Sequence, residues 1–322
     1  MLKILALLLG GMAAWGSATA DMEMARPHIR KLGTIDCDLV ETTPVVHRGR
    51  LYRFEYVRAG YAPNTTGGSY FRFVDVETGA ATPAFAQGYH LGSAFVARGK
   101  MHVFGVPTWG ASSISRFVCS DRELNAWTRE TILDLPGWTI FNTSVCKGRD
   151  GYVLAFEIGD PAEEAGVAFT IRFAVSQDLK TWKLTPSDRV FTRERYSACP
   201  SILYSNGYYY MIYLEQFPGP TYNPCIVRTR DLIAWESSPL NPIMRYSDDD
   251  RTIANPRLSE KECAHIAQSR NINNSDVDLC EYKGATYIVY SWGDQQGTEF
   301  LAEARHQGRL KDFLPGWFPR NK

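Results

Sequence analysis

The pattern of apolar and polar positions along the chain predicts an all-β protein. In short runs such as residues 50–55 and 208–213, side chains alternate in character and are rich in aromatic and β-branched types. A period of two with this composition is typical of strands in a partly buried sheet. Stripes with the helical period are largely missing, so we expect helices only locally.

One phrase returns five times along the chain: a short apolar strand, a turn that contains glycine, and a second strand rich in aromatic residues. The turn glycines are 50 to 77 residues apart, and they are Gly49, Gly99, Gly151, Gly207 and Gly284. A unit that recurs at such intervals is the signature of a repeat architecture.

Three of the copies continue into a common turn, in which a small polar residue, an aspartate, a leucine and a tryptophan stand at nearly fixed offsets. These turns end at Trp127, Trp182 and Trp235. The pattern predicts a tight turn between two outer strands, with the indole packed between neighbouring sheets. Five copies of a four-stranded antiparallel unit predict a five-bladed β-propeller, which would span residues 21–322 as a single domain.

Two departures from the repeat carry further predictions. Residues 248–269 form an insertion with a helix-like pattern shortly after Pro256, so we expect one short helix between blades four and five. The fifth copy lacks the tryptophan turn. Its outermost strand is therefore expected to come from the N-terminal segment, around residues 28–34, which would close the ring.

Composition narrows the possible partners. The 322 residues include 35 basic and 35 acidic side chains, a balance without the basic excess that nucleic-acid binding requires. Residues 1–20 resemble a cleavable secretory signal, with an early lysine, a short apolar run and an Ala-x-Ala pattern before Asp21. We therefore expect a secreted or periplasmic protein, with no membrane span in the mature chain.

Metal or cofactor chemistry is not predicted. The seven cysteines are scattered and form no CxxC pair, so mostly buried thiols with one or two disulfides are the expectation. The sequence contains no HExxH, GxSxG or glycine-rich phosphate loop. We expect neither a metal site nor a cofactor, and the sequence leaves the oligomeric state open.

The repeat resembles the five-bladed propeller glycosidases, a group that includes glycoside hydrolase families 43, 32, 62 and 117 and the family 130 mannoside phosphorylases. The resemblance rests on the strand Gly-Tyr-Tyr-Tyr-Met-Ile-Tyr of residues 207–213 and on the turn Ser-Gln-Asp-Leu-Lys-Thr-Trp of residues 176–182. It covers nearly the whole mature chain and is more specific for the fold than for the reaction. It implies an active site in a central funnel, where inner strands begin and second strands end.

Hydrolysis of a glycosidic bond needs two carboxyl groups, one ionised and one protonated. Before the inner strands stand Glu41 in the first copy and Asp276 and Asp278 in the fifth, and we predict catalytic roles for them. The general acid of family 43 is a glutamate two residues before a proline on a later inner strand, where this chain has Ala198. The resemblance therefore extends to the scaffold and not to the catalytic set.

Further candidates follow the second strands. Glu215 is unique to its copy and is the candidate acid, and His90 is an alternative because family 117 enzymes are thought to use a histidine. Glu55 and Glu157 each stand six residues after their turn glycine. We interpret them as equivalent positions that either contact substrate or pair with an arginine in the scaffold. Asp294 is a further predicted substrate contact.

Other substrate contacts are expected from the ends of strands and the loops around the funnel. Aromatic rings suit the apolar faces of sugars, and amide and guanidinium groups suit their hydroxyls. The predicted contacts are Trp109, Trp292, Asn142, Arg195, Tyr196 and Asn274.

These features favour a secreted, exo-acting and inverting glycoside hydrolase that acts on oligosaccharides from plant or algal polysaccharides. A non-catalytic carbohydrate-binding propeller is the alternative, because Ala198 replaces an expected acid. Phosphorolysis, as in family 130, is a third interpretation that would require Arg195, Arg251 and Arg270 to gather around a phosphate.

Overall fold

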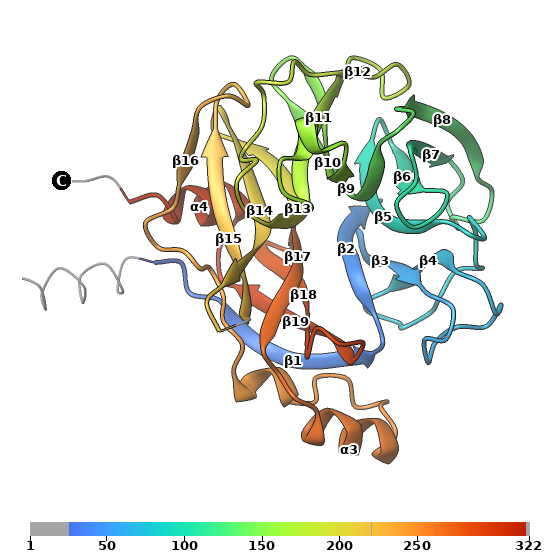
Figure 1. The fold of residues 1–322 in the computed structure, drawn as a ribbon. Helices are drawn as coiled ribbons and strands as arrows, with labels where there is room; N and C mark the ends of the chain where they lie inside the picture. Colours follow the sequence, from blue (N-terminus) through green and yellow to red (C-terminus); the bar gives the residue numbers. More distant parts are fainter. Residues whose placement is uncertain (1–25, 220, 320–322) are drawn as a thin grey trace, which may run out of the picture.

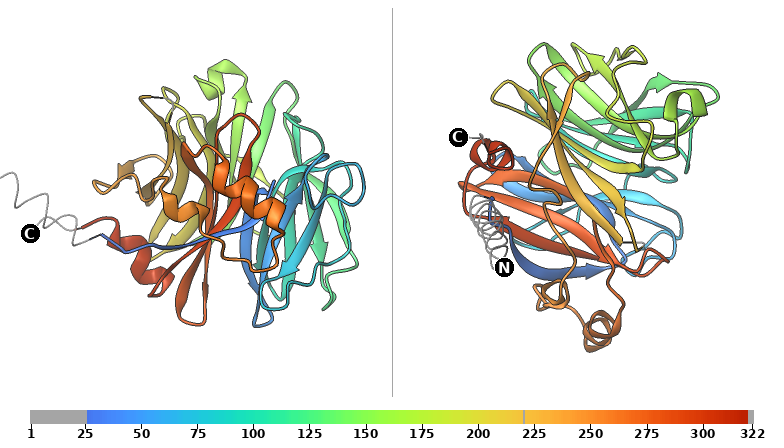
Figure 2. Two further views of the ribbon diagram at one scale, coloured as in Figure 1. Left: turned by 90° about the horizontal axis from the view of Figure 1, so that it is seen from below. Right: turned by 60° about the vertical axis from the view of Figure 1, so that its left-hand side comes forward.

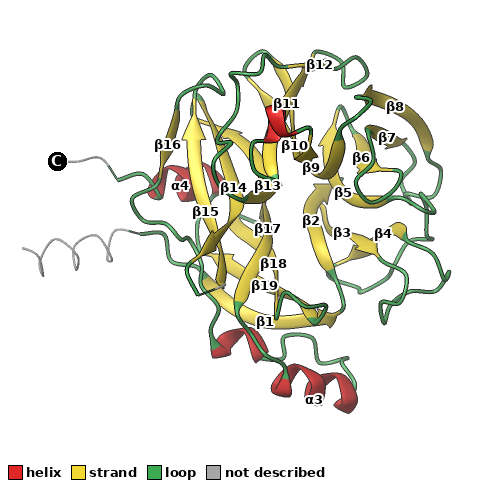
Figure 3. Cartoon of the chain, in the orientation of Figure 1, coloured by secondary structure: helices red, strands yellow, loops and turns green. Residues whose placement is uncertain are grey.

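The computed structural model describes residues 26–219 and 221–319, so the predicted signal in residues 1–20 lies outside the described part of the chain. Strands dominate the described residues, and the helices are few and short (Figure 3). No helix in the described ranges is long and apolar enough to cross a membrane. The prediction of an all-β protein is confirmed.

The strands form four sheets, which can be divided along the chain into five consecutive antiparallel groups, because groups four and five belong to one eight-stranded sheet. Group one contains β2 (Val40–His47), β3 (Arg50–Val57) and β4 (Tyr70–Asp75); group two contains β5 (His90–Ala97), β6 (Lys100–Val106), β7 (Ser113–Cys119) and β8 (Thr128–Asp134). Group three contains β9 (Thr139–Gly148), β10 (Gly151–Asp160), β11 (Thr170–Ser176) and β12 (Lys183–Leu184); group four contains β13 (Ser197–Ser205), β14 (Tyr208–Phe217), β15 (Thr221–Thr229) and β16 (Trp235–Ser237). Group five contains β17 (Asn273–Tyr282), β18 (Ala285–Gly293), β19 (Glu299–His306) and β1 (Arg30–Cys37).

Group one departs from the predicted four strands. It has three strands, and isolated bridges from Phe71 to Phe85 and from Val74 to Ala81 stand where a fourth would lie. The segment between these bridges includes a proline, Pro83, which has no N–H to donate to a ladder. The prediction of four strands in every group is therefore wrong for group one.

The N-terminal segment completes group five. Strand β1 pairs antiparallel with β19, from Arg30 opposite Arg305 to Cys37 opposite Phe300. This confirms the expectation that the segment around residues 28–34 supplies the outermost strand of the last copy. Strand β1 lies beside β19 along the lower edge of the view in Figure 1.

The innermost strands of the five groups lie side by side in a cycle: β2 beside β5, then β9, β13 and β17, with β17 returning to β2 (Figure 1). The four hydrophobic clusters fill the spaces between neighbouring groups all round this cycle. Side-chain packing therefore holds the neighbouring groups together, and a parallel bridge between Tyr222 and Asn273 also joins groups four and five. Each inner strand places its N-terminal half at one end of the central axis and its hairpin turn at the other.

The tryptophan turns form as the repeat predicts. In the turn at Trp182, the Asp178 carboxylate accepts hydrogen bonds from the N–H groups of Lys180 and Thr181, both at 2.8 Å, which lowers the pKa of Asp178 to about 2. The Trp182 ring packs edge-on against Phe104 of group two. The Trp127 and Trp235 rings likewise stack on Phe85 and Phe173 of the preceding groups, so each turn locks two sheets together.

Short helices lie outside the sheets. Between β16 and β17 the chain forms the 3-10 helix η1 (Asp248–Arg251) and the helix α3 (Glu260–Gln268), and α2 (Ala162–Ala165) and α4 (Leu310–Gly316) are further short helices. Helix α3 projects from the lower edge of the molecule in Figure 1 and in the right view of Figure 2. Its N-terminus is a capping box between Ser259 and Glu262.

Asp250 fixes the insertion to group five. Its side chain is completely buried and forms a 2.7 Å ion pair with Lys31 of β1. It also accepts a hydrogen bond from the Tyr290 hydroxyl of β18 at 2.8 Å and from the Asn274 amide of β17 at 3.1 Å. One buried carboxylate thus joins three strands of group five, including the N-terminal strand β1.

All seven cysteines lie in the described ranges, and all are free thiols. The expected one or two disulfides are therefore absent from these residues. Burial raises the pKa of several of these thiols, including Cys146 and Cys225, which favours the protonated form.

Candidate functional site at the axial mouth

Five equivalent positions surround one end of the central axis, each six residues before the last residue of its inner strand. They are Glu41, Leu91, Asn142, Cys199 and Asp276. Four of them have left-handed backbone angles, with φ between 49° and 52°, at points where the strand register shifts. Bulges with strained backbone are common beside functional sites because they redirect a side chain. We call this end of the axis the mouth.

A second ring of small polar side chains lies two residues further along each inner strand. Its members are Thr43, Ser93, Ser144, Ser201 and Asp278. The Ser201 hydroxyl donates to Asp278 at 2.7 Å, and burial raises the pKa of Asp278 to about 6. A cavity of about 30 Å³, lined by residues of both rings, narrows the axis to the size of roughly one water molecule. Asp278 therefore lies beneath the mouth, in the wall of a constriction.

Glu41 shares the mouth with an arginine. The Arg58 Nη2 atom donates to both carboxylate oxygens of Glu41, at 2.9 and 2.8 Å. Burial is the largest influence on Glu41 and raises its pKa to about 8, with Asp276 and Glu299 acting in the same direction and Arg58 opposing. Glu41 therefore combines three features: it lies at a strained bulge, its carboxyl group is buried, and Arg58 is its compensating cation.

Glu157 reaches the mouth from β10. Its Oε2 atom accepts hydrogen bonds from the Asn142 amide at 3.0 Å and from the Cys199 backbone N–H at 2.8 Å. Burial raises its pKa to about 7, the nearby Asp276 charge adds to this, and the two hydrogen bonds oppose it. Glu157 has no ion pair among the described residues, so nothing cationic holds it ionised. It is poised to exchange a proton near neutral pH.

Asp276 is the common neighbour of the other acids. Its charge raises the pKa of Glu41, Glu157 and Glu299. The Cys199 thiol is hydrogen-bonded to it, and burial together with the surrounding carboxylates raises the pKa of that thiol well above its usual value. We call Glu41, Glu157, Asp276 and Glu299 the axial acid cluster. It draws carboxyl groups from three of the five groups of strands.

Two members of the mouth were missed by sequence reasoning. Glu299 opens β19, where the Tyr61 hydroxyl donates to it at 3.0 Å and Arg58 lies at 3.7 Å. Arg58 directly follows β3. The predicted acids came only from the starts of first strands and the ends of second strands, so a residue on a third strand lay outside them. The one sequence signal that could have indicated Arg58 as part of the mouth is its place at the end of a second strand, three residues after Glu55.

His90 lies next to the cluster and is held by two hydroxyl groups. Its Nδ1 atom is 2.5 Å from the Tyr56 hydroxyl, and its Nε2 atom is 3.2 Å from the Ser69 hydroxyl. Burial and the Arg58 charge lower its pKa, so the ring is neutral at neutral pH. A neutral imidazole with both nitrogens engaged is suited to holding the mouth in shape.

Aromatic rings form an arc beside the acids. Successive rings of the arc are in contact, with centroid distances of 5.2 to 5.8 Å, in the order Trp109, Phe141, Phe169, Tyr196 and Tyr222. Trp109 is 54% exposed and lies 5.4 Å from the Arg58 guanidinium. The arc thus runs from the acid cluster across groups two to four, and it includes the predicted contacts Trp109 and Tyr196.

Glu55 does not share the environment of Glu157, and the predicted equivalence of the two was wrong. Glu55 is completely buried and pairs with Arg53 and Arg72, both at 2.8 Å. In group one, Arg50 is the first paired residue of β3, whereas in group three Gly151 itself is the first paired residue of β10. Glu55 is therefore the sixth residue of its strand and Glu157 the seventh, although both stand six residues after a glycine. A difference of one residue places the two side chains on opposite faces of their sheets.

Two other candidates lie apart from the cluster. Glu215 accepts a hydrogen bond from the Tyr213 hydroxyl at 2.5 Å and lies 3.5 Å from Arg195. Arg195 in turn lies over the Phe191 ring. Glu215, Tyr213, Arg195 and Phe191 therefore form a separate cluster beside the strands of group four. Asp294 accepts hydrogen bonds from the N–H groups of Gln296 and Thr298, which stabilise the loop before β19.

Asn274 and Trp292 are interior residues rather than substrate contacts. Both are 0% exposed. Asn274 donates to Asp250, while Trp292 stacks on Phe300 and donates to the Thr34 hydroxyl at 2.8 Å. They are covered because the insertion packs over this side of group five.

The arginines required for phosphate binding do not gather at the mouth. Arg195 pairs with Glu215, and Arg251 pairs with Asp248 of the insertion at 2.7 Å. The described residues also contain no group of three His, Cys, Asp or Glu side chains placed to hold a metal ion.

Comparison with known proteins supports the fold. No protein-family model matches the sequence, and no curated protein matches it. A solved structure described as a glycoside hydrolase aligns over 95% of this chain and 99% of its own, with a TM-score of 0.64 at 13% identity. The chain has the fold of the propeller glycoside hydrolases.

Other solved structures show the same similarity in fold. A complex of BT0996 with RGII aligns over 94% of this chain and 99% of its own, with a TM-score of 0.63 at 14% identity. The α-L-arabinofuranosidase of Podospora anserina, solved with cellotriose, covers 88% and 99%, with a TM-score of 0.60 at 9% identity. The neighbours include members of families 43 and 62, which are five-bladed propellers. At these identities the similarity concerns the fold alone.

Proposed function

We propose that this protein is a glycoside hydrolase built on a five-bladed propeller, and that the axial acid cluster is its active centre. The observation that carries the proposal is Glu157. It is a buried carboxyl without a cationic partner, its pKa is raised to about 7, and it shares the mouth with Asp276 and Glu41. Two carboxyl groups with different protonation states are the basic requirement of glycosidic bond hydrolysis.

The environments assign the roles. Glu157 is the general acid, because burial keeps a proton on it at pH values where an exposed glutamate is ionised. Asp276 is the partner that activates water, with the Cys199 thiol as a hydrogen-bond donor that orients it. Glu41 and Arg58, which are hydrogen-bonded to each other, position the sugar hydroxyls. This assignment replaces Glu215 as the acid and keeps Asp276 from the sequence prediction.

The substrate is an oligosaccharide that is cut from its end. The inner strands surround the acid cluster on all sides, and the axis narrows directly beneath it, which favours entry of a chain terminus. The aromatic arc from Trp109 to Tyr222 offers rings for the sugars that follow. Export through a signal in residues 1–20 fits a plant or algal polysaccharide as the source, and inversion is the stereochemical outcome we propose.

A panel of aryl glycosides and of plant and algal oligosaccharides tests the proposal. We expect the wild-type protein to release product and the Asp276→Asn variant to lose activity on all of these substrates. The Glu157→Gln variant should lose activity on the oligosaccharides, and both variants should keep their fold. Glu215→Gln is the matched control and should retain activity. NMR of the first-formed anomer tests inversion.

Two outcomes would reject the proposal. If both mouth variants remain as active as Glu215→Gln, the acid cluster is not the active centre. If the wild-type protein binds sugars and releases no product from any of them, a non-catalytic carbohydrate-binding function replaces hydrolysis.

A further inference from the structure

The end of the axis opposite the mouth is rich in basic residues. The inner hairpin turns meet there, and four of the five carry Arg48, Arg98, Arg149 or Lys283 within the turn. Two of the basic residues at these turns are neutralised: Arg50 pairs with Asp75 and Lys283 with Glu77. Of the basic residues without an ion pair, Arg98 and Arg149 lie in the turns of groups two and three.

A cavity of about 740 Å³ opens between these two groups. It is lined by the turns at Arg98 and Arg149, by Lys147, by the Phe95 and Tyr152 rings, and by Gln177. Its volume lies in the range of ordinary small-ligand sites. The mouth is at the other end of the same inner strands, so this cavity is separate from the acid cluster.

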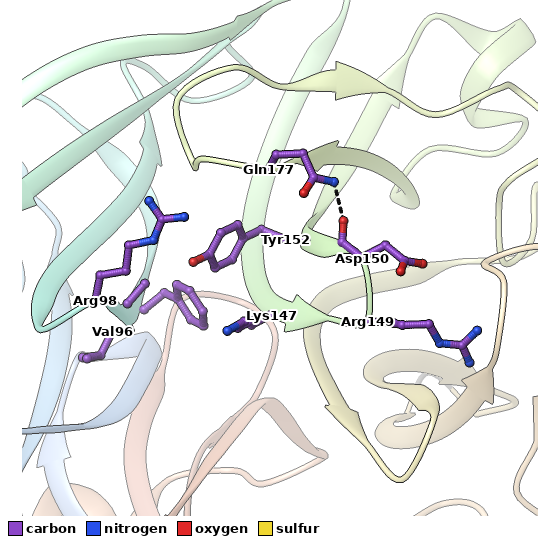
Figure 4. Close-up of a pocket in the computed structure, with 10 residues that line it drawn as sticks. Val96, Arg98, Lys147, Arg149, Asp150, Tyr152 and Gln177 are labelled. Carbon is purple, nitrogen blue, oxygen red and sulfur yellow. Dashed lines mark hydrogen bonds between the residues drawn. The ribbon is translucent and has the colours of Figure 1, made fainter.

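The polar groups of the cavity are available to a ligand. Figure 4 shows the Arg98 guanidinium and the Tyr152 hydroxyl facing each other, with the Lys147 ammonium on the near side and the Asp150 carboxylate directed away from Arg98. Neither Arg98 nor Lys147 forms an ion pair with any described residue. The Gln177 amide donates to the Asp150 carbonyl, which leaves its own oxygen free to accept.

Cationic side chains near the cavity act on the neighbouring His102. Burial is the main cause that lowers the pKa of His102 to about 4, and the charges of Arg116, Lys100 and Arg98 lower it further. Such a field attracts anions. The Phe95 and Tyr152 rings, 5.9 Å apart, add an apolar wall of the kind that contacts sugar rings.

We propose that this cavity binds an acidic oligosaccharide, with Arg98 and Lys147 holding the carboxylate of a uronic acid residue and Tyr152 and Gln177 its hydroxyls. The choice of an anion rests on the cavity, and the choice of a sugar rests on the proposed function. A site at this face would hold one part of a polysaccharide while another part enters the mouth. The mouth and the cavity then have opposite charge preferences.

Calorimetric titration tests this with the Glu157→Gln variant, so that no ligand is consumed. The ligands are an oligogalacturonate, a neutral oligosaccharide of equal length, and inorganic phosphate. We expect the uronate to bind more tightly than the neutral oligosaccharide, whose binding at the mouth does not involve Arg98 or Lys147, and we expect no measurable binding of phosphate. Adding Arg98→Gln and Lys147→Gln should weaken uronate binding by about tenfold or more, and Lys100→Gln, in the same turn and outside the lining, should leave it within about twofold.

Three results would overturn the inference: equal binding of the neutral sugar, equal binding of phosphate, or no loss of binding in the Arg98 and Lys147 variant. Hydrolysis of a small aryl glycoside, measured with Glu157 restored, should be unchanged by Arg98→Gln. Because the titration needs no turnover, a failure of this inference is distinguishable from a failure of the proposed activity.

Discussion

Glu55 and Glu157 stand at the same count from their turn glycines, and both are buried, yet they have opposite surroundings. Glu55 lies between two arginines, and each of its oxygens receives a guanidinium at 2.8 Å. Glu157 lies between an amide and a backbone N–H, with a neighbouring negative charge and no cationic partner in the described part of the chain. The first carboxylate is compensated and structural, whereas the second is uncompensated and chemically poised.

The difference originates in one residue of the hairpin turn. Because Gly151 already pairs in β10 while Gly49 does not pair in β3, Glu157 faces group four and Glu55 faces group five. Alternation along a strand converts that single offset into a change of neighbours. In a repeat protein, equivalence must therefore be counted from paired residues rather than from turn glycines.

The largest expected effect is on catalysis. Glu157→Gln removes the proton donor, and we expect kcat to fall by about 10² to 10⁴ on substrates with poor leaving groups. A substrate with an activated leaving group should be much less affected, since its departure needs little protonation. Steady-state kinetics on both substrate types checks this. Equal losses on the two would contradict the assignment of Glu157 as the acid.

The corresponding change at Glu55 should act on stability. Glu55→Gln leaves Arg53 and Arg72 buried without their counterion, so we expect the free energy of unfolding to fall by about 3 to 5 kcal/mol. Urea denaturation at pH 7 measures the loss. Activity per folded molecule should remain near that of the wild-type protein, and a selective loss of activity would move Glu55 into the functional site.

Glu157 should also reduce stability as the pH rises. Its folded pKa of about 7 lies above the usual glutamate value of 4.5, so its contribution to stability is complete below pH 4.5 and is lost as the pH rises through 7. Glutamine does not titrate. The stability of Glu157→Gln relative to the wild type should therefore increase by about 3 kcal/mol between pH 4.5 and pH 8. A difference that stays constant with pH would show that Glu157 has an ordinary pKa.

The sequence predicted the scaffold well and the site only in part. The Trp182 turn and the pairing of residues 28–34 depend on local pattern and on the count of strands, and both formed as expected. The burial of Trp292 depends on how a distant insertion docks through Asp250, which no local pattern encodes. Glu299 and Arg58 meet Glu41 only because the last group of strands returns to the first.

The smallest expected effect is a shift in the pH profile. The Asn142 amide donates to the Glu157 carboxylate and so stabilises its ionised form, which lowers the pKa of Glu157 against the effect of burial. Asn142→Ala removes that donor, and the alkaline limb of the activity profile should move to higher pH by about half a unit to one unit. Profiles of kcat/KM from pH 5 to 9 for Asn142→Ala, with Glu215→Gln as the control, would measure it. A shift to lower pH would contradict the role of Glu157 as the titrating acid, because removing a donor from a carboxylate can only make its proton harder to lose.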